Sequence, residues 1–267
     1  MWNEAFFWRS WIVAVITAVL AGPVGCLMIW RRTAFFSDAL SHSALAGILL
    51  GTVLGMGQNA GIVILVCLLA LLLSRVSEGF LTGVDVLLLI IAQTSLCAGL
   101  IGLSYADGLR SDLTGYLFGD VLAVTDKDLI FTCFTAVLCA ALLFPNWKRQ
   151  VFIAVSPDMA QSEGVALKRQ SVLFMTVTAL FVALSLKTTG MLLVSALLVI
   201  PPAAARFLSK TPEQMAVIGS LTGVLAVTAG LMLSVSFDSP AAPTMEICCA
   251  VLFVAARFSA CRHKKII

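Results

Sequence analysis

The chain has 267 residues, of which 60% are hydrophobic and 12% are charged, and its mean hydropathy is +1.05. These values lie far outside the range of ordinary water-soluble domains and exclude a separable soluble enzyme. The formal net charge of +3 is small. We therefore expect an integral membrane protein whose residues 1–267 form a single transmembrane domain.

Hydrophobic runs recur along the chain, and each is about long enough to cross a bilayer core of roughly 30 Å as a helix. They are continuous rather than alternating, which argues against an outer-membrane barrel. The first run stays apolar past Pro23, so we expect a retained span and not a cleaved signal peptide. We predict an all-α bundle of eight or nine spans. The runs cover residues 8–30, 39–56, 61–73, 84–104, 129–144, 172–186, 191–205, 216–235 and 245–258.

The basic residues orient this bundle. If the first span starts outside, the cytoplasmic connections hold all of the 17 Lys and Arg residues except Arg9, Arg110, Lys127 and Lys187. This distribution satisfies the positive-inside rule with the N-terminus outside and the C-terminus in the cytoplasm. The same asymmetry accounts for the net charge, so we expect no nucleic-acid partner.

Asp38 and His42 stand out in "FFSDALSHSALAGILLG", residues 35–51. Residues four apart share a helix face, and ionisable residues inside membrane helices indicate function. Zn²⁺ accepts both carboxylate oxygen and imidazole nitrogen. The alternative is that Asp38, or Ser37 before it, caps the span while His42 is satisfied near the interface. Because this span starts on the cytoplasmic side, either it starts deeper than 39–56 suggests, or the pair guards the inner half of a pathway.

One Asp and one His do not complete a tetrahedral zinc site, and an importer needs a loose site that releases its ion. Further ligands would come from a second copy of the chain, from water, or from polar groups. The candidates of this kind are Ser41, Asp85 and Gln93.

Two backbone features accompany the pair. Gly47, Gly51 and Gly55 recur every four residues, which predicts close helix packing. Pro201 and Pro202 are expected to break or end the seventh span and to free carbonyls toward a cavity, although an ordinary kink or helix end explains them equally well.

Two polar stretches lie outside the runs. "YLFGDVLAVTDKDL" suggests a partial helix on the outer side, where Asp107, Asp112 and Asp120 form either an acidic rim or solvated loop charges. Residues 146–170 are cytoplasmic by the charge rule. Within them, a short helix is predicted from Ser156 as N-cap, Pro157 and Asp158 in the first turn, and Gly164 as terminator.

This short helix is either a solvated connector or a docking helix for a cytoplasmic partner. The chain has no GxxxxGK phosphate loop. If ATP energises transport, another subunit must therefore bind it.

Several longer stretches carry a family resemblance. They are "AGPVG", "WRRTAFFSDALSHSALAG", "DLTGYLFGDVLAVTDKDL", "SPDMAQSEGV", "TTGMLLVSALLVIPPAAAR", "KTPEQMA" and "FDSPAAPTMEICCAVLF". With them the chain resembles the membrane permease subunits of bacterial ABC importers for divalent transition metals, the ABC-3 metal-ion permease family, and more narrowly its high-affinity zinc uptake branch.

The resemblance implies a homodimer in the bacterial inner membrane that transports Zn²⁺, holds no permanent cofactor and is not itself an enzyme. It implies an extracytoplasmic zinc-binding protein and a cytoplasmic ABC ATPase dimer that hydrolyses the ATP. The metal residues would be Asp38 and His42. The ATPase would dock on Ser156, Pro157, Asp158, Ala160, Glu163, Gly164 and Val165.

Alternatives remain open. Manganese and iron permeases of the family share the "DALSH" core, and Gln93 stands where zinc relatives tend to carry histidine. A secondary transporter would need more buried acids than this chain offers. An intramembrane metalloenzyme would need a closed ligand set such as HExxH, which is absent.

Overall fold

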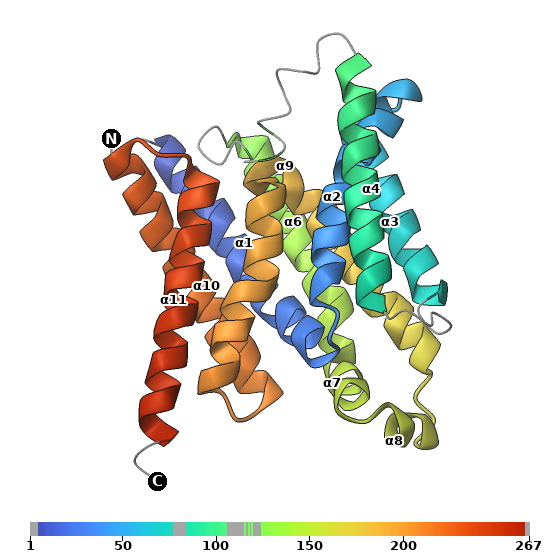
Figure 1. Cartoon of the computed structure of the whole chain (residues 1–267), viewed down its shortest axis with the longest axis vertical. Helices are drawn as coiled ribbons and strands as arrows, with labels where there is room; N and C mark the ends of the chain where they lie inside the picture. Colours follow the sequence, from blue (N-terminus) through green and yellow to red (C-terminus); the bar gives the residue numbers. More distant parts are fainter. Residues whose placement is uncertain are drawn as a thin grey trace.

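The computed structural model describes residues 5–76, 84–105, 115, 117, 119 and 124–264, and these form only helices and their connections. The helices lie roughly side by side, and α1 begins at the end of the bundle opposite to that where α11 ends (Figure 1). The helices are α1 Ala5–Trp30, α2 Ala34–Val53, α3 Gln58–Val76, α4 Val84–Tyr105, α6 Asp126–Leu143, the 3₁₀ turn η2 Phe144–Asn146, α7 Trp147–Val155, α8 Pro157–Ser162, α9 Leu167–Leu208, α10 Pro212–Phe237 and α11 Ala241–Lys264.

The number of spans agrees with the prediction. Seven of the described helices are long and apolar enough to cross a membrane, and α3 supplies a shorter apolar helix, Gln58–Ser74. Helix α9 is two arms joined at Gly190, where φ is 76° and ψ is 160°, a conformation that glycine alone adopts readily. Both ends of α9 lie toward the lower end of the molecule in Figure 1. The described residues therefore form nine apolar helical arms.

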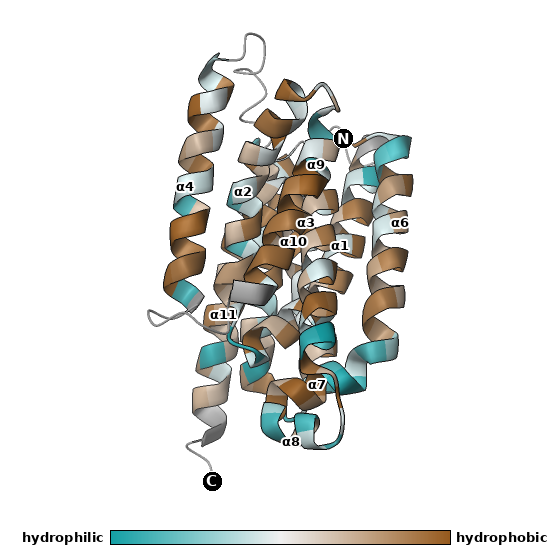
Figure 2. Ribbon diagram, turned by 90° about the vertical axis from the view of Figure 1, so that its right-hand side faces the viewer, coloured by the Kyte–Doolittle hydropathy of each residue, from teal (hydrophilic) through white to brown (hydrophobic). Residues whose placement is uncertain are grey.

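Helix α9 forms the centre of the bundle, where it packs on α1, α2, α3, α6, α10 and α11. Its aromatic residues Phe174 and Phe181 are fully buried, together with Leu27 and Met28 of α1 and Phe36 of α2. Large apolar side chains are exposed on the outside of many helices, whereas hydrophilic residues concentrate around α7 and α8 (Figure 2). This is the distribution expected of a bundle that contacts lipid along its length.

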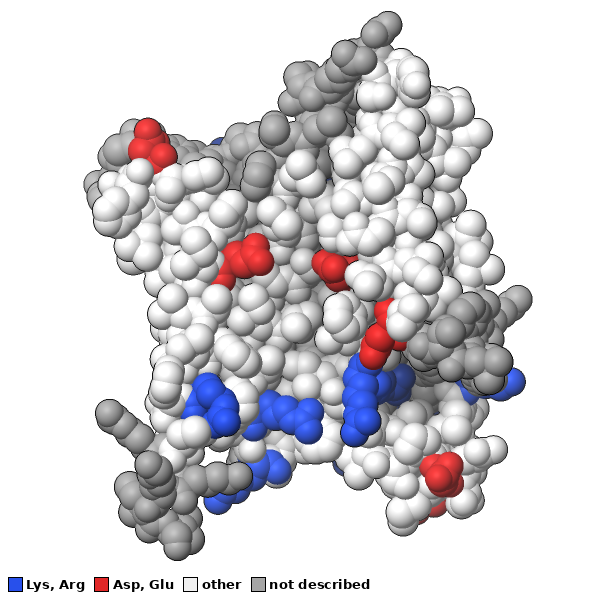
Figure 3. All heavy atoms as spheres, in the orientation of Figure 1, with Lys and Arg blue, Asp and Glu red and all other residues white. Residues whose placement is uncertain are grey.

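The two ends of the bundle differ in their charged residues. Lys and Arg side chains form a band across the lower part of the face in Figure 3, and the positive-inside rule assigns this end to the cytoplasm. At the opposite end, Arg9 Nε lies 2.8 Å from Asp126 Oδ1, and Lys187 Nζ lies 2.8 Å from Asp128 Oδ1. The described cations of the outer end include these two, which are paired with carboxylates at the start of α6.

The predicted break at the double proline is wrong. Pro201 and Pro202 are buried inside the second arm of α9, which continues to Leu208. Pro202 leaves the carbonyl of Leu198 without its helical donor, and this carbonyl packs directly against Gly25 of α1. Contact with α1, and not a cavity, covers the freed group, so the helix continues.

The predicted close packing of the glycines in the second span is confirmed for two of them. A Cβ atom on Gly47 would lie 2.8 Å from Ile62 Cα, and one on Gly51 would collide with the backbone of Gly57. Gly55 lies beyond the end of α2, in a turn with φ of 65° and open space around it. Helices α2 and α3 therefore touch backbone to backbone, which fixes the position of α2.

Part of the outer segment "YLFGDVLAVTDKDL", namely residues 116, 118 and 120–123, lies outside the described residues, as do Asp107, Asp112 and Asp120. The continuous description resumes with Val124, and the hydroxyl of the next residue, Thr125, caps α6 in a reciprocal arrangement with Asp128.

Candidate metal pathway and docking helix

Asp38 and His42 lie inside α2, because this helix begins five residues earlier than the hydrophobic run suggested. Thr33 occupies the N-cap position, and the Ser37 hydroxyl donates to the Ala34 carbonyl at 3.1 Å. The alternative in which Asp38 or Ser37 caps the helix is therefore wrong. His42 comes eight positions after Ala34, so it lies about 12 Å along the helix axis from the start of α2. This is deeper in the span than a helix start at residue 39 would place it.

The two side chains contact each other. His42 Nε2 lies 3.3 Å from Asp38 Oδ1, and the side chains are 19% and 43% exposed, respectively. Ala46 and Leu49, which are also partly exposed, follow along the same side of α2. The pair therefore lies on a partly open stripe of an otherwise buried helix.

Two buried polar atoms beside the pair lack partners. His42 Nδ1 and Ser41 Oγ have no hydrogen bond within the described part of the chain. When Nε2–H donates to Asp38, Nδ1 of the neutral imidazole carries a free lone pair. Buried polar atoms are normally paired. Ser41 Oγ and, in this tautomer, His42 Nδ1 are therefore electron-pair donors without a partner in the described part of the chain.

Glu246 of α11 is a further acidic residue near the pair, and the sequence prediction missed it. Its carboxyl lies within electrostatic range of Asp38 and is partly buried. Acidic side chains lie at mid-height on the face seen in Figure 3, above the basic band. The sequence alone could have identified this residue. Glu246 is the one acidic residue in the predicted span 245–258, and an acidic residue inside a membrane span indicates function.

Asp85 and Gln93 of α4 do not join the site within one chain. Both are exposed, and in the described residues no hydrogen bond or ion pair links either of them to Asp38 or His42. Nor do the described residues contain a group of three or more His, Cys, Asp or Glu side chains close enough to hold a metal ion. Within the described residues, a single copy thus brings together no closed set of metal-ligating side chains.

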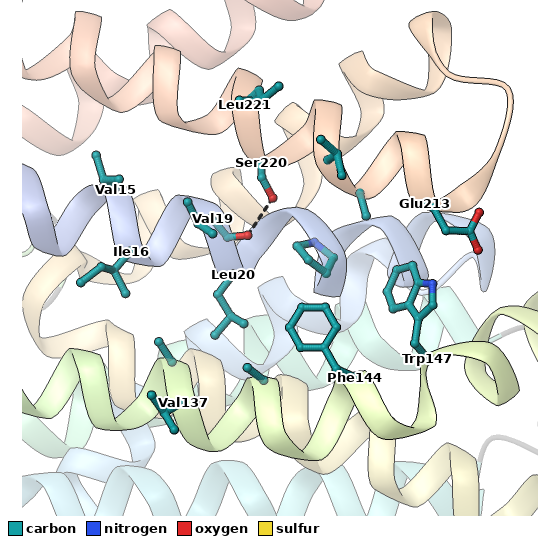
Figure 4. A pocket seen from close by; sticks show the side chains of 15 residues that line it. Val15, Ile16, Val19, Leu20, Val137, Phe144, Trp147, Glu213, Ser220 and Leu221 are labelled. Atoms are coloured by element: carbon teal, nitrogen blue, oxygen red, sulfur yellow. Dashed lines mark hydrogen bonds between the residues drawn. The ribbon is translucent and has the colours of Figure 1, made fainter.

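A separate groove lies between α1, α6 and α10 and has a volume of about 790 Å³. Figure 4 shows that its wall is apolar, with Phe144, Trp147 and Glu213 toward one end. The Ser220 hydroxyl in its wall is already used, since it donates to the Val19 carbonyl at 2.7 Å. Such a wall cannot replace the hydration shell of a divalent cation, so this groove is not a metal pathway.

The predicted short cytoplasmic helix is confirmed as α8, which projects from the lower end of the bundle (Figure 1). Ser156 takes the N-cap position with extended backbone angles, although its hydroxyl makes no capping bond. Gly164, with φ of 81°, ends the helix. Its N–H donates to the Gln161 carbonyl and that of Val165 to the Ala160 carbonyl, both at 3.0 Å, which is the Schellman arrangement.

The surface of α8 divides into two sides. Ala160 is fully buried and Val165 partly buried, which holds the helix against the bundle. The opposite side is exposed: it carries Pro157, Asp158, Met159, Glu163 and Gly164.

The fold and the site together define a class, that of multi-pass transport permeases with a helix projecting on the cytoplasmic side. The chain belongs to the ABC 3 transport family, whose profile matches residues 3–260. It is therefore a multi-pass protein of the bacterial inner membrane.

Known relatives support this assignment over nearly the full length. The chain is 36% identical to the "High-affinity zinc uptake system membrane protein ZnuB" of Haemophilus influenzae, over 92% of this chain and 95% of the relative. It is 27% identical to the "Manganese transport system membrane protein MntC" of Halalkalibacterium halodurans, over 96% and 88%. The solved structure "PsaBC from Streptococcus pneumoniae in complex with Fab" superposes with a TM-score of 0.85 at 26% identity, covering 95% of this chain and 91% of that one.

Proposed function

We propose that the chain is the membrane subunit of an ATP-driven importer that carries Zn²⁺ into the cytoplasm. The observation that supports this most directly is the contact between Asp38 and His42, with 3.3 Å between Oδ1 and Nε2 on a partly open stripe of α2. Carboxylate oxygen and imidazole nitrogen are both zinc ligands. The relative of highest identity named above is a zinc uptake protein.

The passing ion interacts with Asp38 and His42 and is attracted by the nearby carboxyl of Glu246. Few ligands and partial solvent access keep the binding weak, because a closed four-ligand cage would hold zinc too tightly for release. Two copies of the chain face each other across the pathway, and the second copy and water complete the coordination shell.

Two features of the chain indicate its protein partners: the absence of a phosphate loop from its sequence and the exposed side of the segment 156–165. The chain has no phosphate loop of its own, so a dimer of cytoplasmic ATPase subunits hydrolyses the ATP. These subunits dock on residues 156–165, where α8 exposes Asp158, Met159 and Glu163. An extracytoplasmic binding protein delivers zinc to the outer end.

Metal uptake tests this function. Cells that lack their own importers receive this chain with its ATPase and binding protein, and uptake of ⁶⁵Zn and ⁵⁴Mn is measured at nanomolar free metal. We expect His42→Ala to lower zinc uptake at least tenfold. His263→Ala, which changes the only other histidine of the chain, is the matched control and is expected to leave uptake unchanged. Full zinc uptake by a normally expressed His42→Ala variant would remove the pair from the pathway.

Manganese import is the second candidate, favoured by the relative from Halalkalibacterium halodurans, a "Manganese transport system membrane protein". Asp38 and His42 suit Mn²⁺ as well, since carboxylate ligands bind it and imidazole tolerates it. Uptake of ⁵⁴Mn without ⁶⁵Zn in the same cells would select this branch of the family.

A further inference from the structure

A series of hydrogen bonds between buried and partly buried side chains connects the cytoplasmic helices with the turn that precedes α2. Arg31, which directly follows α1, donates from Nη2 to Gln150 Oε1 of α7. Gln150 Nε2 donates to Gln170 of α9, both to Oε1 at 2.9 Å and to the backbone carbonyl at 3.0 Å. Gln170 Nε2 donates to Asn146 Oδ1 at 3.2 Å, and Asn146 Nδ2 donates to the Leu142 carbonyl at 3.1 Å.

Arg31 fixes the orientation of the amide groups in this series of hydrogen bonds. A guanidinium group can only donate, so Gln150 must turn its oxygen toward Arg31 and its NH₂ toward Gln170. Gln150 is fully buried and Gln170 is 6% exposed. Buried amides find no water to replace a lost hydrogen-bond partner. The loss of one hydrogen bond in this series therefore destabilises or reorients the neighbouring side chains.

Arg31 itself is held on two sides. Its guanidinium carbon lies 4.7 Å from the centre of the Phe174 ring, a cation–π contact. Burial lowers the pKa of Arg31 to about 10, which leaves the group charged at neutral pH. Its Nε is buried without a hydrogen-bond partner in the described residues. Among the described residues, the polar contact that anchors this cation is therefore the one to Gln150.

A tight turn joins Arg31 to the metal residues. The Thr33 N–H donates to the Met28 carbonyl at 2.9 Å, and the Arg32 N–H donates to the Ile29 carbonyl at 3.2 Å. Arg32 has φ of 57°, the left-handed conformation that a Schellman motif requires. A displacement of Arg31 is therefore passed directly to α2, in which Asp38 lies seven residues further along the chain.

At its other end the chain of hydrogen bonds is joined to α8. Ser156 is at once the C-cap residue of α7 and the N-cap residue of α8, so no flexible linker separates these two helices. Gln150 lies in α7, six residues before Ser156. A force applied to α8 therefore reaches Gln150 through a continuous path of backbone.

We propose that the contact between Gln150 and Arg31 transmits movements of α8 to α2 and thereby repositions Asp38 and His42 during transport. Arg31 and Gln150 are positioning residues, which act through α2 and do not touch the metal. The inference rests on the proposed function, in which α8 receives the force from the ATPase. The contact depends on a specific pair of groups, because the Arg31 guanidinium donates and the Gln150 amide oxygen accepts at the cytoplasmic edge of the bundle.

The ratio of zinc transported to ATP hydrolysed tests the proposal, measured on the complete importer in proteoliposomes. Arg31→Met removes the donors and keeps the length of the side chain, and Arg32→Met, at the exposed neighbouring position, is the matched control. We expect Arg31→Met to lower the ratio at least tenfold with ATP hydrolysis within twofold of wild type, and Arg32→Met to change neither. A wild-type ratio for Arg31→Met would overturn the proposal.

A second pair of variants covers the case in which Arg31→Met does not fold. Gln150→Glu keeps an acceptor for Arg31, whereas Gln150→Leu removes it at similar volume. We expect the ratio to stay within threefold of wild type for Gln150→Glu and to fall at least tenfold for Gln150→Leu. Equal ratios of zinc transported to ATP hydrolysed for the two variants would overturn the proposed role of the contact between Gln150 and Arg31. Absence of zinc transport by the wild type would instead contradict the proposed function.

Discussion

The contact between α2 and α3 gives a prediction of stability that can be worked from distances. In Gly47→Ala, the new Cβ would lie 2.8 Å from Ile62 Cα, whereas carbon atoms in good contact are about 3.5 to 4.0 Å apart. The two backbones must therefore separate by roughly 1 Å, because no flexible side chain can yield. Overpacking of this kind costs about 1–3 kcal/mol.

A matched variant removes the effect of helix propensity. Gly223→Ala makes the same replacement inside α10, where the nearest atom, Ala18 Cβ, would be at an ordinary 3.4 Å. Both variants gain about 1 kcal/mol of intrinsic helix propensity, so this gain cancels in their comparison. We expect Gly47→Ala to be about 1–3 kcal/mol less stable than Gly223→Ala, which corresponds to roughly 2–4 °C in Tm for each kcal/mol.

The assay uses the cysteines of the chain itself. Cys97, Cys133 and Cys261 are exposed and react with a fluorogenic thiol reagent in the folded protein, whereas the buried Cys26, Cys139 and Cys249 react only as the detergent-solubilised protein unfolds. The rise in fluorescence during heating therefore reports Tm. A Tm for Gly47→Ala equal to or above that of Gly223→Ala would refute the close backbone contact between α2 and α3.

Three further predictions concern the backbone and the outer ion pairs. Arg32→Gly is expected to raise Tm, since glycine removes roughly 1 kcal/mol of left-handed strain at φ of 57°; a lower Tm would contradict the Schellman turn. Gly190→Ala is expected to lower Tm or abolish folded protein, because φ of 76° with ψ of 160° costs a residue with a side chain about 1–3 kcal/mol; unchanged Tm would place the turn of α9 elsewhere. A double-mutant cycle on Arg9 and Asp126, whose side chains are 39% and 69% exposed, should give a coupling below about 1 kcal/mol; a larger coupling would show that the pair is shielded from water.

The sequence was sufficient for features that depend on local pattern. Continuous apolar runs predicted the spans, and Ser156, Pro157 and Gly164 predicted a short helix that the structure shows as Pro157–Ser162. The start of α2 was placed too late, because hydropathy does not register a first helical turn that contains polar residues. The double proline was misjudged, since the local rule ignores that α1 covers the freed carbonyl.

Contacts between distant parts of the chain could not be predicted in this way. Asp38 and Glu246 are separated by more than 200 residues, and only the packing of α2 and α11 on their common neighbour α9 brings the two charges within electrostatic range. The partners of Gln150 likewise come from distant segments, since Arg31 lies in the turn after α1 and Gln170 lies in α9. A single sequence identifies such polar residues as unusual, but the tertiary fold decides which of them meet.

The unequal charge of the two ends has a consequence for the divalent cations around each end. At the outer end, Arg9 and Lys187 are neutralised by Asp126 and Asp128, so a divalent cation arriving there meets little repulsion from these side chains. At the inner end the band of Lys and Arg side chains (Figure 3) produces a positive potential that extends about one Debye length, roughly 8–10 Å, into the cytoplasm. A divalent cation in the cytoplasm is therefore repelled by the inner end, so the charges that orient the chain in the membrane also lower the local concentration of divalent cations beside its cytoplasmic surface.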